Sequence, residues 1–210
     1  MERLKKISGL YVILDSSILG KRPLVPVARQ VLAGGATVLQ LRDKTADSRT
    51  LLRKAKALLK LTRPKHALLI INDRVDITVA SGADGVHLGE TDLTIAQARR
   101  MLGHGKIIGA TSHDLAEAKA NARAGADYVS LGAIFKSSIK PHLKPTGLAL
   151  LGRVCRAVRK PIVAIGGIHA GNIQGVMEAG AASAAVISAV LKAGNVKKAV
   201  QSLVSRVRTT

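Results

Sequence analysis

The stretch GGATVLQLRDK, residues 34–44, contains the local unit that decides the fold. Its two glycines suit the left-handed turn that closes a helix, and the apolar run 38–41 that follows has the length of a buried strand. Polar and charged residues come directly after the run. The chain repeats the opening of this unit three times, as GADGV at 82–86, GADYV at 125–129 and GAASA at 180–184. Helix, turn and strand are therefore expected to alternate along the chain.

Short runs rich in Val and Ile alternate with longer amphipathic stretches, a pattern typical of parallel strands covered by helices on both faces. The eight runs that we predict to be strands are residues 10–14, 38–41, 67–71, 85–88, 106–110, 128–134, 161–165 and 184–190. Eight strands with helices between them in 210 residues predict one α/β domain, residues 1–210, folded as a (β/α)8 TIM barrel. An open doubly wound sheet is the alternative.

The composition excludes several classes of protein. One cysteine, Cys155, cannot close an internal disulfide, so a reducing, cytoplasmic setting is expected. The longest apolar run, residues 181–191, is shorter than the ~18 residues of a membrane helix, and no export signal is predicted. The net charge of +20 favours anionic partners, either polymers or small molecules. Because aromatic residues make up 1% of the chain, stacking on single-stranded nucleic acid is an unfavoured reading, and nucleic acid is not expected as a partner.

Polar residues follow nearly every predicted strand. In a barrel of this kind the carboxyl ends of the strands carry the chemistry, so these residues are expected to meet at one rim. They are Gln40, Arg42, Asp43, Lys44, Asn72, Asp73, His87, Glu90, Asp92, Thr111, Ser112, His113, Lys136, Ser137, Ser138, Lys140, Gly166, Gly167 and Ser188.

Asp73 and Asp92 follow neighbouring strands and have two interpretations. Each could cap a helix N-terminus. Together they could hold Mg²⁺, which takes oxygen ligands and commonly grips a phosphate, and we favour this reading. Arg42, Lys44 and Lys140 beside such an ion would have the chemistry of a diphosphate clamp, and otherwise would be solvated rim charges.

Other candidates are less specific. Gly166 and Gly167 could merely turn the chain, but we favour backbone N–H groups offered to a phosphate after the seventh strand. His87 and His113 receive no role, because no nucleophilic triad is apparent. Cys155, on a helical stretch with Val154 and Val158, is predicted to be a packed thiol.

Six segments resemble, in order, the signatures of the thiamine-phosphate synthase family. They are QLRDK at 40–44, IND ending at Asp73, HLGETD ending at Asp92, GATSH at 109–113, GAIFKSSIK at 132–140 and AIGGI at 164–168. The similarity runs from about Leu10 to Ala189. It implies a transferase that joins 4-amino-2-methyl-5-hydroxymethylpyrimidine diphosphate to hydroxyethylthiazole phosphate with Mg²⁺, giving thiamine monophosphate and pyrophosphate, with the diphosphate leaving first.

The resemblance also implies the roles of individual residues. The pyrimidine diphosphate would be bound by Gln40, Leu41, Arg42, Asp43, Lys44, Asn72, Thr111 and Lys140, of which Arg42, Thr111 and Lys140 would be catalytic. Asp73 and Asp92 would bind Mg²⁺. The thiazole phosphate would be bound by Ser137, Ser138, Ile139, Gly167, Ile187 and Ser188. The partners implied are phosphorylated small molecules, without a membrane; a homo-oligomer is left open.

The chain departs from the family pattern at two places. Thr111 stands where Ser is usual and keeps the hydroxyl, whereas Ser137, Ser138 and Ile139 replace a threonine-rich phosphate loop and leave one hydroxyl fewer. A sister branch isomerises the thiazole precursor instead, tends to lose the two aspartates and can carry histidine at the position of Ala133. A tautomerase-like relative is therefore one alternative to the synthase. A basic nucleic-acid-binding protein, suggested by the net charge alone, is the other.

Overall fold

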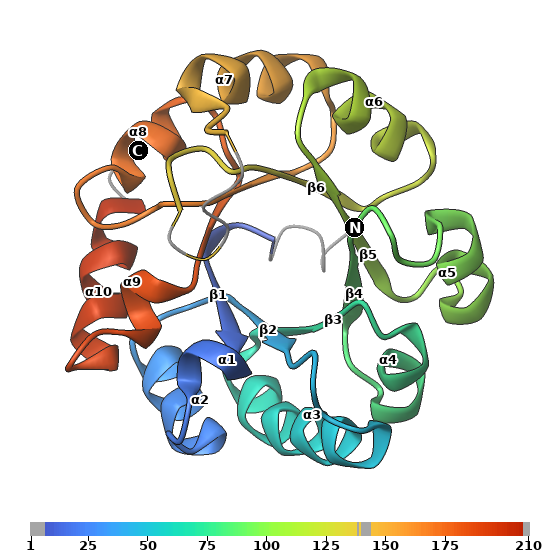
Figure 1. Cartoon of the computed structure of the whole chain (residues 1–210), viewed down its shortest axis with the longest axis vertical. Helices are drawn as coiled ribbons and strands as arrows, with labels where there is room; N and C mark the ends of the chain where they lie inside the picture. The colour runs from blue at the N-terminus through green and yellow to red at the C-terminus, as the bar shows by residue number, and fades with distance from the viewer. Residues whose placement is uncertain (1–6, 138, 140–143, 208–210) are drawn as a thin grey trace.

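The computed structural model describes residues 7–137, 139 and 144–207, and it confirms the predicted barrel. Eight parallel strands pair in chain order, and β8 pairs with β1 to close the sheet (Figure 1). The strands are β1 (Gly9–Asp15), β2 (Val38–Arg42), β3 (Leu68–Asn72), β4 (Gly85–Leu88), β5 (Ile107–Ser112), β6 (Tyr128–Leu131), β7 (Ile162–Ile165) and β8 (Ser183–Val186).

Helices form a ring outside the closed sheet, as Figure 1 shows. They are α1 (Ser16–Leu19), α2 (Leu24–Ala33), α3 (Ser48–Thr62), the 3-10 turn η2 (Arg63–Lys65), α4 (Val75–Ser81), α5 (Ile95–Leu102), α6 (Leu115–Arg123), α7 (Gly147–Ala157), α8 (Ile173–Glu178), α9 (Ser188–Leu191) and α10 (Val196–Val207). Among the described residues no helix has the length and hydropathy needed to cross a membrane.

Alternation along the strands divides the core into two clusters. In β2, Leu39 and Leu41 are fully buried in the larger cluster, between the sheet and the helices. Val38 belongs to the smaller cluster inside the barrel, and Gln40 and Arg42 continue the same inward face. Because successive side chains of a strand point to opposite faces, every second residue near a strand's carboxyl end reaches the barrel mouth.

Two tyrosines fill much of the barrel interior. Tyr11 on β1 and Tyr128 on β6 are fully buried, their rings meet edge to face at a centroid distance of 6.2 Å, and their hydroxyl oxygens are 3.1 Å apart. Gly109 on β5 makes room for Tyr128, because a Cβ atom at Gly109 would lie 1.9 Å from Cζ of that ring. The interior is thus packed by a few large side chains.

Most strand boundaries lie within two residues of the prediction, and two strand ends differ by three residues or more. The sixth strand ends at Leu131 instead of residue 134, and the eighth ends at Val186 instead of residue 190. Ser188 was expected late in the eighth strand and is instead the first residue of α9. An apolar run that leaves a buried strand for a buried helix keeps the same composition, so its period does not reveal the change.

Candidate active site

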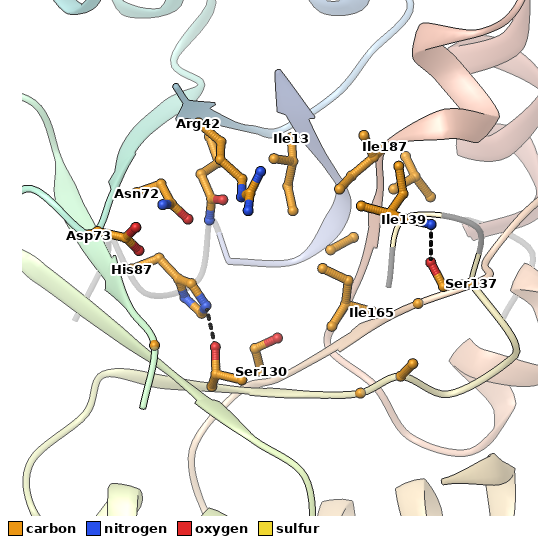
Figure 2. A pocket seen from close by; sticks show the side chains of 18 of the residues that line it. Ile13, Arg42, Asn72, Asp73, His87, Ser130, Ser137, Ile139, Ile165 and Ile187 are labelled. Carbon is orange, nitrogen blue, oxygen red and sulfur yellow. Dashed lines mark hydrogen bonds between the residues drawn. The ribbon is translucent and has the colours of Figure 1, made fainter. Parts of the chain in front are cut away.

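A cavity of about 330 Å³ opens at the carboxyl ends of the strands. Of the described residues, those lining it include Ile13, Gln40, Arg42, Lys44, Asn72, Asp73, His87, Glu90, Asp92, Thr111, His113, Ser130, Ser137, Ile139, Ile165, Gly166, Gly167, Ala185, Ile187 and Ser188. Figure 2 shows Asn72, Asp73 and His87 on one side of the cavity and Ile139, Ile165 and Ile187 on the other. The cavity therefore has a charged half and an apolar half.

The two aspartates of the charged half face each other. The pKa of Asp92 is raised above its ordinary value by burial of the carboxyl group and by the neighbouring Asp73, against the opposing effect of the Gly89 N–H, which donates to Asp92 Oδ2 at 2.7 Å. Lys44 Nζ lies 3.4 Å from Asp73 Oδ2. The structure thus brings together three of the groups that were predicted to bind a metal ion and a diphosphate.

Neither aspartate caps a helix, so the alternative reading is wrong. The N-cap of α4 is Arg74, and the N-cap of α5 is Thr94, which forms a capping box with Gln97. Asp73 has a φ of 62°, a left-handed conformation that is uncommon outside glycine, and its N–H donates to the His87 carbonyl at 2.8 Å. The local backbone therefore turns this carboxylate toward the end of β4 instead of toward a helix.

The donor set fits a hard divalent cation. Two neighbouring carboxylates gain from a shared cation that offsets their repulsion, and oxygen donors suit Mg²⁺. Within residues 7–137, 139 and 144–207 there is no cluster of three or more His, Cys, Asp or Glu side chains that could enclose an ion. Water and substrate oxygens could complete the coordination of the ion, which is how Mg²⁺ commonly meets a phosphate.

Arg42 is held at the rim by a buried carboxylate. Its Nη1 lies 2.5 Å from Oδ2 of Asp15, whose side chain is 2% exposed. Asp15 Oδ1 also accepts hydrogen bonds from the N–H and hydroxyl of Ser17, which tie it to the start of α1. A guanidinium anchored on one edge keeps its other N–H groups for an anion in the cavity.

Gln40, Asn72 and Thr111, which were predicted to bind the pyrimidine diphosphate, line the charged half, but two other residues with the same predicted role do not line the cavity. Leu41 points outward into the core beneath the helices. Asp43 is turned away to Lys54 of α3, with an Nζ–Oδ2 distance of 2.5 Å. The alternation of strand side chains, which places Gln40 and Arg42 inside, separates them from these two. Ser138 and Lys140 lie outside the described residues.

The apolar half contains the residues predicted for the second substrate. Ser137, Ile139, Gly167, Ile187 and Ser188 line it, and the Ile139 N–H donates to the Ser137 hydroxyl at 3.2 Å. Gly167 has a φ of 66°, and a Cβ atom there would lie 2.5 Å from the Lys136 carbonyl oxygen. Glycine at this position lets the loop after β7 approach the segment after β6.

Several residues of the cavity and its rim have no role predicted from the sequence. His87 and His113 line the cavity; His87 Nε2 is 3.0 Å from the Thr111 hydroxyl, a bond drawn from His87 in Figure 2, and His113 Nδ1 is 2.6 Å from the Gly132 carbonyl oxygen. Asp15 and Ser130 were not singled out. Asp15, His87 and Ser130 occupy inward positions of β1, β4 and β6. Their alternation with the apolar outward residues of these strands is the sequence signal that could have identified them.

Cys155 lies apart from the site. It is half-buried on α7, and burial raises the pKa of its thiol to about 11. The prediction of a packed thiol fits this environment, since a nucleophilic cysteine needs a lowered pKa.

Comparison with known proteins assigns the family. Residues 10–190 match the family model described as thiamine monophosphate synthase. The chain belongs to this family. It is 46% identical to the thiamine-phosphate synthase of Methanoculleus marisnigri over 94% of both chains, and 45% identical to that of Chlorobium phaeovibrioides over 93% of this chain and 92% of the relative.

A solved structure agrees with the assignment. The thiamine phosphate pyrophosphorylase from Pyrococcus furiosus superposes with a TM-score of 0.91 at 38% identity, covering 98% of each chain. The chain is therefore a transferase of the thiamine-phosphate synthase family, and the predicted resemblance and enzyme class are confirmed.

Proposed function

We propose that this synthase joins 4-amino-2-methyl-5-hydroxymethylpyrimidine diphosphate to hydroxyethylthiazole phosphate, with Mg²⁺ held by Asp73 and Asp92. The observation that carries the proposal is the division of one cavity into a half with Arg42, Lys44 and the two carboxylates and a half walled by isoleucines. The charged half suits a diphosphate, and the apolar half suits a flat heterocycle.

The reaction proposed is a dissociative group transfer. The bond between the pyrimidine methylene carbon and the diphosphate oxygen breaks, and pyrophosphate leaves with the electron pair. The lone pair of the thiazole nitrogen then forms the new C–N bond to the methylene cation. The nitrogen carries no proton to lose, so the step needs no general base and no covalent nucleophile.

The residues act by electrostatics and position. Negative charge grows on the diphosphate as it departs, and Arg42, Lys44 and the Thr111 hydroxyl can stabilise it from fixed positions. A bound divalent cation would supply further charge neutralisation of the leaving group. The apolar wall of Ile13, Ile165 and Ile187 excludes water that would otherwise react with the pyrimidine methylene cation.

The proposal is tested with purified protein, both substrates and Mg²⁺. We expect thiamine monophosphate and pyrophosphate in equal amounts, loss of product with a chelator, and a loss of at least about 10²-fold in kcat/KM for Asp73→Ala. The matched control is Asp76→Ala, which removes a carboxylate that is 54% exposed and paired with Arg74 on α4. Absence of product from the wild type, or equal activity of the two variants, would overturn the proposal.

A further inference from the structure

A continuous line of hydrogen bonds crosses the inside of the barrel below the cavity. Gln40 Nε2 donates to the Tyr11 hydroxyl at 2.8 Å, and the Tyr11 and Tyr128 oxygens are 3.1 Å apart. Tyr128 Oη is 2.9 Å from Nδ1 of His87, whose Nε2 is 3.0 Å from Thr111 Oγ1. The line begins at Gln40 and ends at Thr111, which both border the cavity. Its two tyrosines are buried beneath the cavity.

One donor-to-acceptor direction can run along the whole line, from Gln40 to Thr111. The Gln40 amide nitrogen can only donate, so the Tyr11 oxygen accepts from it, and the Tyr11 hydrogen can then be donated to the Tyr128 oxygen. With Tyr128 accepting from Tyr11, its own hydrogen is available to Nδ1 of His87. In this arrangement the imidazole accepts at Nδ1, is neutral with its hydrogen on Nε2, and can donate this hydrogen to Thr111.

The surroundings hold the line in place. Burial raises the pKa of both tyrosines, which keeps them as neutral hydroxyls. The His87 ring stacks on Tyr128 at a centroid distance of 5.6 Å and an angle of 17°, and Gly109 leaves space for the Tyr128 ring. The ring orientation of His87 is therefore set by packing as well as by hydrogen bonds.

We propose that Tyr128 is a positioning residue that acts through His87 on Thr111. By fixing the Nε2–H tautomer of His87, the Tyr128 hydroxyl makes the Thr111 oxygen an acceptor on its inner side and leaves the Thr111 hydroxyl hydrogen to point into the charged half of the cavity. This inference rests on the proposed function for the identity of the anion. In that reaction the departing diphosphate accepts the hydrogen of the Thr111 hydroxyl.

The first experiment needs no substrate. The ring nitrogens of His87, assigned with a His87→Gln variant, are observed by long-range ¹H–¹⁵N NMR in the wild type. We expect the Nε2–H tautomer; the Nδ1–H tautomer would overturn the proposal. In Tyr128→Phe, which keeps the ring and deletes only the hydroxyl, we expect a mixture of tautomers, and an unchanged Nε2–H form would also contradict the proposal.

The second experiment is a double-mutant cycle on kcat. We expect Tyr128→Phe to lower kcat about tenfold and Thr111→Val about 10²-fold, with the double variant no slower than Thr111→Val alone, because the tyrosine acts through that hydroxyl. Effects that multiply would show that Tyr128 acts by another route. The same cycle is measured on pyrophosphate binding in the presence of Mg²⁺. If the wild type forms no product, the proposed reaction is refuted, but the binding cycle still tests whether Tyr128 acts through Thr111.

Ser183→Ala is the matched control for structural damage. It deletes another fully buried hydroxyl of a barrel strand, one that donates to the Gly9 carbonyl at 2.9 Å and does not line the cavity. We expect a loss of stability comparable with that of Tyr128→Phe, an unchanged His87 tautomer and kcat within about twofold of the wild type. A tenfold fall in kcat in this control would mean that loss of any buried hydroxyl explains the effect.

Discussion

Arg42 and Asp15 are paired in the register of β1 and β2, and their side chains form an ion pair with Nη1 2.5 Å from Oδ2. The arginine side chain is 24% exposed and the aspartate side chain 2% exposed, so the carboxylate is the buried partner. The pair connects the first strand, the start of α1 and the charged half of the cavity. Stability and substrate binding are therefore expected to depend on the same carboxylate.

Asp15→Asn should weaken both properties. The amide keeps an oxygen for Ser17 but loses the charge that holds Arg42, so we expect a loss of about 1–3 kcal/mol in unfolding free energy. We also expect KM for the pyrimidine diphosphate to rise about tenfold, because the guanidinium is no longer held in place. Urea unfolding and steady-state kinetics measure the two effects, and a variant with wild-type KM would show that Asp15 does not position Arg42.

Asp43→Asn should affect stability but not substrate binding. Burial alone would raise the pKa of Asp43, but hydrogen bonds from Lys54, Ser16 and the N–H groups of Thr45 and Ala46 outweigh it and lower the pKa below its ordinary value. A lowered pKa in the folded state contributes stability that is present above about pH 4 and is lost as the pH falls further.

We therefore expect Asp43→Asn to cost about 1–2 kcal/mol at pH 7, and this difference from the wild type to shrink at pH 3. Urea unfolding at the two pH values measures it. Since the side chain does not line the cavity, kcat/KM should stay within about twofold, and a rise in KM for the diphosphate would return Asp43 to the binding site.

Asp92→Asn should not destabilise the protein without a divalent cation. The pKa of Asp92 is raised in the folded state, so the folded chain binds this proton more tightly than the unfolded chain does. Stability therefore decreases as the pH rises from the ordinary aspartate pKa through the raised one, and the wild type carries this cost at pH 7.

In Asp92→Asn the side-chain amide oxygen can still accept the hydrogen bond from the Gly89 N–H, and the buried negative charge is gone. The thermal midpoint of this variant should therefore equal or exceed that of the wild type at pH 7. Added Mg²⁺ and pyrophosphate should raise the midpoint of the wild type but not of Asp92→Asn. Asp76→Asn is the control, because it removes a carboxylate outside the cavity whose pKa is lowered by the neighbouring Arg74. Mg²⁺ and pyrophosphate should still raise the midpoint of this variant. An equal rise in all three proteins would place the ion elsewhere.

Gly109→Ala should disrupt the barrel interior. Its Cβ atom would lie 1.9 Å from the Tyr128 ring, which has no free space to move into because it is fully buried. We expect a loss of about 3 kcal/mol or more in unfolding free energy, measured by urea denaturation, together with lower kcat. Gly194→Ala, where no atom lies within 4 Å of the added carbon, is the control, and similar stability of the two variants would contradict the packing described.

The residues that follow the predicted strands could be placed at one rim from the sequence, because strand ends in a parallel barrel share a side whatever their neighbours are. Arg42, Asn72, Asp73 and Asp92 were identified in this way, and all line the cavity. Asp43 shows where that reasoning ends: it stands next to Arg42 in the sequence, yet its side chain pairs with Lys54 on the outer side. Which way a residue turns just after a strand depends on partners from other elements.

The amino-acid sequence by itself determined the alternation of strands and helices, the family and the polar character of one barrel end, since these depend on local periodicity and on residues that stay together along the chain. Only the tertiary structure decided that Tyr11 and Tyr128, 117 residues apart, share a hydrogen bond, and that the resulting line ends at Thr111. Such contacts exist because β8 pairs with β1 and closes the sheet, which brings inward side chains of distant strands into one small interior.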